Sequence, residues 1–249
     1  MTDAHTLPKL PLAQLDATSF HRNYVRTKRP VHLADTISTW GARRWTEASL
    51  RALLGSKIVK VSHSRKSTFD YNVGSSADAP IRKLMPFAEA LALIYSEQGG
   101  SYYIAQQNMQ KEFPELLPDV GRPALLNEWK IVDVTNLWIG GKGCKTPLHF
   151  DANDNFLVQV GGTKRVTLFP PEQSANLYPA LGDLLEHCSR VNVFAPDRDA
   201  FPLFAQAEAY RIELRLDAGD TLYIPAKWWH AVETLEASIS INFWWRALT

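Results

Sequence analysis

Residues 146–169 read TPLHFDANDNFLVQVGGTKRVTLF, and this stretch decides the fold that we expect. It begins with a His-x-Asp pair, His149 and Asp151. Two apolar runs follow, 155–160 and 164–169, and a Gly-Gly turn separates them. Short runs of strand-forming residues bounded by glycine predict a β-strand, a turn and a second β-strand, which opens on a cation.

The same pattern continues through the second half of the chain. Short β-rich runs are separated by Gly, Pro, Asp and Asn, which is typical of a sandwich or a barrel, and the jelly roll is one such fold. We expect a mainly β protein with flanking helices. The predicted strands of its core, 129–249, are 131–139, 155–160, 164–169, 190–194, 210–216, 221–224 and 237–245.

Residues 1–128 have a mixed pattern and are interpreted as an embellishment of that core, so that 1–249 form a single domain. Helices are predicted where apolar residues recur at helical spacing next to a capping or breaking residue. Alternating apolar residues predict short strands. The predicted helices are 12–24, with a break or a cap at 16–19, 45–54 and 84–95, and the predicted strands are 30–33, 58–62 and 102–106.

Composition narrows the class of protein. The 249 residues are 45% hydrophobic and 21% charged, as in an ordinary globular protein. The 27 Lys and Arg nearly balance the 26 Asp and Glu, so bulk charge does not indicate a polyanionic partner. Two cysteines do not indicate a disulfide framework, residues 1–10 lack the apolar core of a signal peptide, and no apolar run is long enough for a bilayer. We therefore expect a cytoplasmic protein with no membrane partner.

Four of the eight tryptophans form two adjacent pairs, Trp228-Trp229 and Trp244-Trp245. Adjacent residues on a strand point to opposite faces of the sheet. Each pair therefore predicts a strand that is packed on both sides.

Three side chains are candidate metal ligands. On a strand, His149 and Asp151 would share a face, because positions i and i+2 lie on the same side. His230, inside the strand-like run 228–232, is the candidate third ligand. Two histidines and one carboxylate can form a facial triad with three open positions, as Fe(II) oxygenases need, whereas a structural zinc site is closed and usually contains cysteine.

With its surroundings, this cluster resembles the JmjC-type, cupin-8 branch of the Fe(II)- and 2-oxoglutarate-dependent oxygenases, in particular the JmjC arginyl hydroxylase and the wybutosine-tRNA hydroxylase. The resemblance spans nearly the whole chain, and the order and spacing of its motifs agree throughout. It implies a double-stranded β-helix, the jelly roll of the cupin/JmjC type. The matching stretches are 103–106 (YIAQ), 146–151 (TPLHFD), 155–160 (NFLVQV), 168–171 (LFPP), 218–225 (AGDTLYIP), 229–230 (WH) and 242–245 (NFWW).

The resemblance also implies residue roles. The triad would bind Fe(II), and Lys164 would pair with the distal carboxylate of 2-oxoglutarate. Thr146 matches a hydroxyl position in that pocket, and Tyr102 takes the place of Tyr103 if the register slips by one residue. The residues implied are His149, Asp151 and His230 as catalytic metal ligands, and Lys164, Thr146, Tyr103, Asn155, Asn242 and Trp244 as cosubstrate-binding residues.

The activity implied is oxidative decarboxylation of 2-oxoglutarate to succinate, with O2 as co-reactant, coupled to hydroxylation of a C–H bond. A protein or peptide side chain is the first expectation for the substrate, and a tRNA base or a small metabolite is the alternative. A non-catalytic metal-binding cupin and a zinc- or manganese-dependent isomerase also stay open.

The oligomeric state and the substrate-contacting residues are predicted from features that are less specific than these motifs. Because the chain stops shortly after Trp244-Trp245, where related dimers continue with helices, we expect a monomer. Basic residues at 57–66, with Arg43, Arg44, Arg82 and Lys83, are a candidate surface for acidic or nucleic-acid partners, although solvated charge is common. Candidate residues at the mouth of the barrel are Trp138, Gln106, Tyr71 and Trp228.

Overall fold

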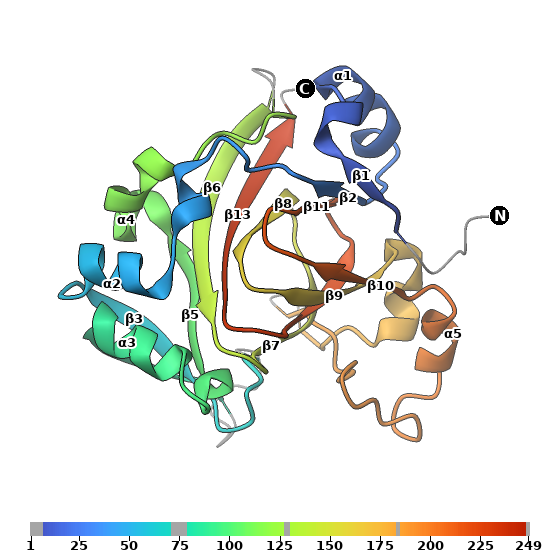
Figure 1. Cartoon of the computed structure of the whole chain (residues 1–249). Coiled ribbons are helices and arrows are strands. Elements are labelled where there is room, and N and C mark those ends of the chain that lie inside the picture. Colours follow the sequence, from blue (N-terminus) through green and yellow to red (C-terminus); the bar gives the residue numbers. More distant parts are fainter. Residues whose placement is uncertain (1–6, 71–78, 127–129, 183–184, 248–249) are drawn as a thin grey trace.

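The computed structural model describes residues 7–70, 79–126, 130–182 and 185–247, and strands dominate it (Figure 1). The helices are α1 (Ala17–Phe20), α2 (Glu47–Leu54), α3 (Phe87–Ile94), α4 (Met109–Glu112) and α5 (Phe204–Glu208). Short 3-10 turns lie at Leu12–Gln14, Gly41–Arg44, Gly99–Ser101, Pro114–Asp119 and Pro171–Leu177, and a π-helical turn lies at His21–Val25. The strands are β1 (Lys9–Pro11), β2 (Val31–Ala34), β3 (Ile58–His63), β4 (Ile81–Pro86), β5 (Tyr102–Asn108), β6 (Lys130–Gly140), β7 (Lys145–Phe150), β8 (Asp154–Gly161), β9 (Lys164–Phe169), β10 (Ile212–Leu216), β11 (Thr221–Ile224), β12 (Trp229–Thr234) and β13 (Ser238–Ala247).

Two sheets form the body of the part of the chain that the structure describes. The larger has the order β1-β2-β11-β8-β13-β6-β5-β3-β4, and the smaller has the order β10-β9-β12-β7. Their inner faces enclose one apolar cluster, to which Leu157 and Leu222 contribute from the large sheet and Val166 and Leu216 from the small one. The mainly β architecture with flanking helices, expected from the sequence, is confirmed.

Helices cover the outer side of the large sheet (Figure 1). Phe87, Leu91 and Ile94 of α3 recur at helical spacing and are fully buried in the main core. Helix α2 begins at a capping box, in which Thr46 accepts from the backbone of Ser49 while the Ser49 side chain accepts from the backbone of Thr46. The predicted 45–54 helix is thereby confirmed, and its start lies two residues later.

The predicted helix 84–95 is wrong at its beginning. Strand β4 continues through Leu84 to Pro86, and α3 starts only at Phe87. Proline disfavours the helical conformation of the residue before it, here Met85, so a helix cannot begin upstream of Pro86. The ladder between β4 and β3, in which Leu84 pairs with Lys60, satisfies the backbone instead.

The break or cap predicted at 16–19 within the helix 12–24 is confirmed, because Asp16 leaves the helical conformation and caps α1 by accepting from the backbone of Thr18 and Ser19. One other predicted element differs. The predicted strand 190–194 is wrong, since these residues form bends and turns. No described strand lies alongside 190–194. The nearest strand-like pairing is two isolated β-bridges just before this segment, at Cys188 and Ser189.

The pair Trp244-Trp245 divides between the two faces of β13, as predicted, whereas Trp228 precedes β12, which begins at Trp229. Trp245 is fully buried in the main core beside Phe156, whereas Trp244 faces the inner side of the barrel and contacts Asp151. Trp229 lies in a second core cluster, and Trp228 lies between the sheets.

Strands from the N-terminal part extend the large sheet at both ends. At the end formed by β1 and β2, an ionic cluster joins both strands to the start of β11. The carboxylate of Asp220, just before β11, lies 2.9 Å from Nε2 of His32 on β2 and 2.8 Å from Nζ of Lys9 on β1. Burial alone would raise the pKa of Asp220, but the hydrogen bonds from His32 and Lys9 outweigh it and leave that pKa below its ordinary value.

Candidate metal centre

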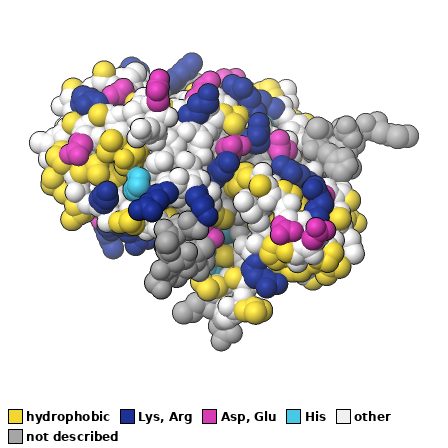
Figure 2. All heavy atoms as spheres, turned by 90° about the horizontal axis from the view of Figure 1, so that it is seen from below, with side chains coloured by type: hydrophobic (Ala, Val, Ile, Leu, Met, Phe, Trp, Pro, Cys, Tyr) yellow, Lys and Arg dark blue, Asp and Glu magenta, His cyan; other side chains and the backbone are white. Residues whose placement is uncertain are grey.

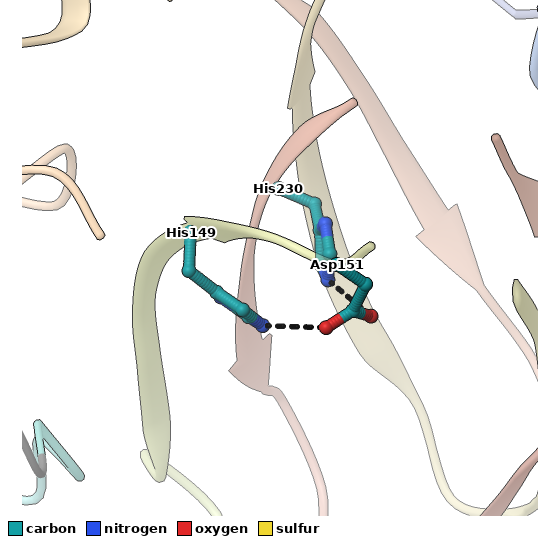
Figure 3. Close-up of side chains that lie close together, drawn as sticks. All are labelled: His149, Asp151 and His230. Carbon is teal, nitrogen blue, oxygen red and sulfur yellow. Dashed lines mark ion pairs between the residues drawn. The ribbon is translucent and has the colours of Figure 1, made fainter. Parts of the chain in front are cut away.

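Two histidines face each other on neighbouring strands of the small sheet. His149 on β7 and His230 on β12 are paired in the antiparallel register, and their ring centroids lie 4.2 Å apart. Figure 3 shows both rings directed toward Asp151. Strand β7 ends at Phe150, so the expectation that Asp151 lies on the strand is wrong by one residue. The Asp151 carbonyl accepts from the backbone of Lys227 instead, yet its carboxylate still reaches the two imidazoles.

Candidate ligand atoms of the three residues lie within 4.8 Å of one another. Oδ1 of Asp151 is 4.0 Å from Nε2 of His149, and Oδ2 is 3.7 Å from Nε2 of His230. Each Nδ1 instead faces a backbone carbonyl, that of Pro147 at 2.9 Å and that of Trp228 at 3.0 Å. Because a carbonyl only accepts, each Nδ1 carries the hydrogen and each Nε2 keeps its lone pair for a metal.

The electrostatic setting keeps His230 neutral. Burial, followed by the charge of neighbouring His149, lowers the pKa of His230 to about 4, although Asp151 and the carbonyl of Trp228 oppose that shift. A neutral imidazole is the form that binds a metal ion. His230 is therefore ready for coordination at neutral pH without first losing a proton.

Asp151 is held by donors from the large sheet. Trp244 Nε1 and Asn155 Nδ2 both donate to Oδ2, at 3.0 and 3.3 Å. Asn242 Nδ2 then donates to Oδ1 of Asn155 at 3.2 Å, and Trp138 Nε1 donates to Oδ1 of Asn242 at 2.7 Å. The structure therefore brings Asn155, Asn242 and Trp244 together around the carboxylate of the triad.

Lys164 is a buried cation, with 2% of its surface exposed. Its Nζ donates to Oγ of Ser240 at 2.6 Å and lies 6.0 Å from the ring centre of Tyr103. Within the described ranges no carboxylate lies at ion-pair distance from it, and burial lowers its pKa to about 8. A buried charge without a counter-ion is unfavourable, so this position favours the binding of an anion.

Register places Lys164 on the same inner face as the triad. Lys164 pairs with Thr234 and Leu168 pairs with His230, in one antiparallel ladder between β9 and β12. Directly paired residues lie on the same side, and residues 164 and 168 are an even number apart. The lysine and the histidine therefore share the inner face of the small sheet, opposite Ser240, Asn242 and Trp244 of β13.

A cleft of about 700 Å³ opens beside His149. Thr146, Tyr103, Trp138 and Gln106 line it, whereas Lys164, Asn155, Asn242 and Trp244 do not. Tyr103 is nearly fully buried and lies over Lys164, whereas Tyr102 packs against His63, so the geometry favours Tyr103 over Tyr102.

Trp228 does not line the cleft. It packs among apolar residues between the sheets, and its Nε1 donates to the carbonyl of Lys28. The mouth position expected for it is therefore wrong, because the Trp228 side chain packs in the apolar cluster between the sheets. Tyr71, the fourth candidate, lies outside the described residues.

Several residues of the site were missed by the sequence interpretation. Ser240, the partner of Lys164, precedes Asn242 by two residues, and this alternation along one strand could have identified it. His187, Cys188 and Arg190 line the cleft because a bridge between Cys188 and His149 brings their loop to β7. No local pattern reveals such a contact.

Comparison with known proteins identifies the family. A model of the cupin-like domain matches residues 17–249. The chain belongs to the cupin-like domain family. Its resemblance to JmjC proteins of this family, expected from the motifs, is confirmed by relatives that match nearly the whole chain.

Three relatives illustrate the range of the family. Lysine-specific demethylase 8 of Xenopus tropicalis is 32% identical over 96% of this chain and 52% of the frog protein. The human bifunctional peptidase and (3S)-lysyl hydroxylase JMJD7 is 28% identical over 91% of this chain and 80% of its own length. Mouse tRNA wybutosine-synthesizing protein 5 is 29% identical over 96% of this chain and 79% of the mouse protein. The chain spans about half the length of the frog and zebrafish demethylase relatives.

Proposed function

We propose that this chain is an Fe(II)- and 2-oxoglutarate-dependent hydroxylase that acts on a protein or peptide side chain. The observation that carries the proposal is the shared inner face of a His-Asp-His cluster and a buried lysine that has no carboxylate partner among the described residues. The His-Asp-His cluster would bind a metal, and the lysine would bind an anion beside it.

The donor set fits iron. His149, Asp151 and His230 offer two neutral nitrogens and one carboxylate oxygen, and neither cysteine belongs to the cluster. Such a set leaves coordination positions open for a chelating cosubstrate and oxygen, whereas a closed structural zinc site would need a fourth protein ligand. These three residues would hold the metal.

Residues around Lys164 fit 2-oxoglutarate. Lys164 would neutralise the distal carboxylate, and Thr146 and Tyr103 would add hydrogen-bond donors to it. A dicarboxylate bound there would satisfy the buried ammonium, so that lysine and ligand compensate each other. Asn155, Asn242 and Trp244 would act mainly by orienting Asp151, since their hydrogen bonds lead to it.

Iron with 2-oxoglutarate and O2 supplies the oxidising chemistry, in which decarboxylation to succinate accompanies hydroxylation of a C–H bond. The chain itself positions the reactants. Carbonyls of Pro147 and Trp228 orient the two imidazoles, and the indole of Trp244 orients the carboxylate. His230 is buried and so has little contact with solvent.

The choice of a protein or peptide substrate is supported by two observations. The cleft beside His149 is open to solvent and lined by both polar and aromatic residues, which suits an inserted side chain. Two of the relatives are named for action on lysine, while a third is named for tRNA. Hydroxylation of a tRNA base is therefore the second candidate.

The test is formation of succinate from 2-oxoglutarate by the purified chain with Fe(II), ascorbate and oxygen. We expect turnover that chelation abolishes and that Fe(II), but not Zn(II), restores. No succinate under any condition would support a non-catalytic cupin or an isomerase, and metal analysis that finds zinc or manganese in place of iron would favour the isomerase. A mass-spectrometric search of lysate proteins, tRNA and metabolites for singly oxygenated products would then identify the substrate.

No helix of sufficient length and apolar character to cross a membrane occurs in the described residues. The monomeric state and the cytoplasmic location stay predictions. We also propose that 1–249 is one folding unit, because strands of the N-terminal part belong to the same sheet as the core.

A further inference from the structure

The mouth of the cleft is rich in positive charge. Lys60, Arg82 and Arg190 line it, against one acidic lining residue, Asp70. All three basic side chains are exposed. Lys60 and Arg82 share a face, because Arg82 pairs with Ser62 across the β3–β4 ladder and Ser62 is two residues from Lys60. Residues from two strands and a distant loop thus place cations around one opening.

Two of these cations, Lys60 and Arg190, are available to a ligand. Among the described residues, neither Lys60 nor Arg190 makes an ion pair. The guanidinium of Arg190 lies 5.7 Å from the ring centres of both Tyr178 and Phe201, which limits its motion without neutralising its charge. An arginine held in this way keeps its hydrogen-bond donors for a carboxylate or a phosphate.

Gln106 adds a neutral polar group at the same mouth. It has a φ of 50° within an irregularity of the β5–β6 ladder between Ile104 and Gln107. This left-handed conformation is uncommon for a residue other than glycine, and such bulges redirect a side chain. The exposed amide of Gln106 thereby lines the cleft, where it can bond to a peptide group.

We propose that the cleft selects an acidic peptide, whose carboxylates contact Lys60, Arg82 and Arg190 while the side chain to be oxidised enters beside His149. This proposal rests on the proposed function and names its substrate class. Charge complementarity of this kind gives specificity and faster association.

A peptide fits better than a nucleic acid. The net charge of the chain is +1, so the positive charge is local, whereas a polynucleotide needs a basic track along many phosphates. Figure 2 shows a face on which Lys and Arg side chains gather in the middle and hydrophobic side chains lie on either side. A mixed surface of this kind suits a peptide with both acidic and apolar residues.

The test is fluorescence anisotropy with three labelled probes: a Glu-rich peptide, the same peptide with Lys at each Glu position, and a single-stranded oligouridylate. The full chain is used under argon with Fe(II) and 2-oxoglutarate, so that the site is filled and turnover is prevented. Lys60→Glu, Arg82→Glu and Arg190→Glu are compared with a control carrying Arg43→Glu and Arg44→Glu, which reverses exposed charges that do not line the cleft.

We expect the Glu-rich peptide to bind at least about tenfold more tightly than the Lys-rich one, each cleft variant to lose about tenfold, and the control to stay within about twofold. Equal binding of the two peptides, or an equal loss in the control, would overturn the proposal. Tighter binding of the oligonucleotide, lost in the same variants, would also overturn it and would indicate RNA. Because no turnover is measured, failure here leaves the succinate test of the proposed function unaffected.

Discussion

The indole Nε1 of Trp244 donates a hydrogen bond to Oδ2 of Asp151 over 3.0 Å and joins the last strand of the large sheet to the candidate metal centre. Partners of this kind orient a ligand and usually contribute about 10–100-fold to metal affinity. We expect Trp244→Phe to weaken Co(II) binding by about that factor, as followed by the absorbance of the bound ion.

Trp45→Phe is the matched control for that variant. Trp45 Nε1 also donates to a carboxylate, that of Asp119 at 2.8 Å, but outside the cluster. Its loss should leave Co(II) affinity unchanged. Equal effects of the two substitutions would mean that Trp244 acts through general stability and not through Asp151.

Asp151→Ala removes the only carboxylate of the cluster. We expect it to abolish succinate formation while the fold survives, because Asp151 is only partly buried and lies just past the end of β7. Turnover is measured alongside the circular dichroism spectrum and the melting temperature. Retained turnover in a folded variant would refute the assignment of the triad.

Lys164→Met keeps a long apolar stem and removes the buried charge. Removing one partner of a buried charged pair commonly costs about 2 kcal/mol or more, so we expect KM for 2-oxoglutarate to rise roughly thirtyfold or more. Arg165→Met, at the next residue, is the control, because Arg165 is exposed and pairs with Glu233. A similar KM in both variants would place the cosubstrate elsewhere.

The same lysine predicts a pH dependence of stability without 2-oxoglutarate. Burial lowers the pKa of Lys164 from 10.5 to about 8, so between these values the unfolded chain binds more protons than the folded one. Stability should therefore rise with pH across this window, by up to roughly 3 kcal/mol from this group. Urea unfolding of the wild type and of Lys164→Met, near neutral pH and near the upper end of the window, isolates the effect. A constant difference between the two proteins would contradict it.

Asp220→Ala should loosen the N-terminal strands. The substitution leaves His32 buried without its partner and frees Lys9, and losses of a buried partner cost about 3–5 kcal/mol. Glu208→Ala, which breaks the exposed pair with Arg198, should cost at most about 1 kcal/mol. Denaturant unfolding compares the two, and a similar small cost in both would show that the Asp220 cluster contributes little.

Much of the fold could be predicted from local patterns. The predicted strands of the core other than 190–194 were confirmed, because alternation and glycine turns are short-range signals, but β7 was not among the predicted strands. The start of α3 was missed because the apolar pattern of Leu84 and Met85 suits a helix, while Pro86 and the pairing with β3 decide for a strand. Segment 190–194 has strand-forming residues but no described strand beside it.

The sequence by itself determined which residues could bind a metal and an anion, and on which segments of the chain they lie. His149, Asp151, His230 and Lys164 could be named because their residue types, spacing and surrounding motifs are properties of the chain. Only the tertiary structure decided how they act together. The pairing of β7 with β12 brings the two imidazoles to 4.2 Å of each other, and β13 brings Trp244 to Asp151 and Ser240 to Lys164. The isolated β-bridge between His149 and Cys188 brings Arg190 to the cleft. These contacts join residues far apart in the chain, and strand register, which depends on the packing of whole sheets, determines them.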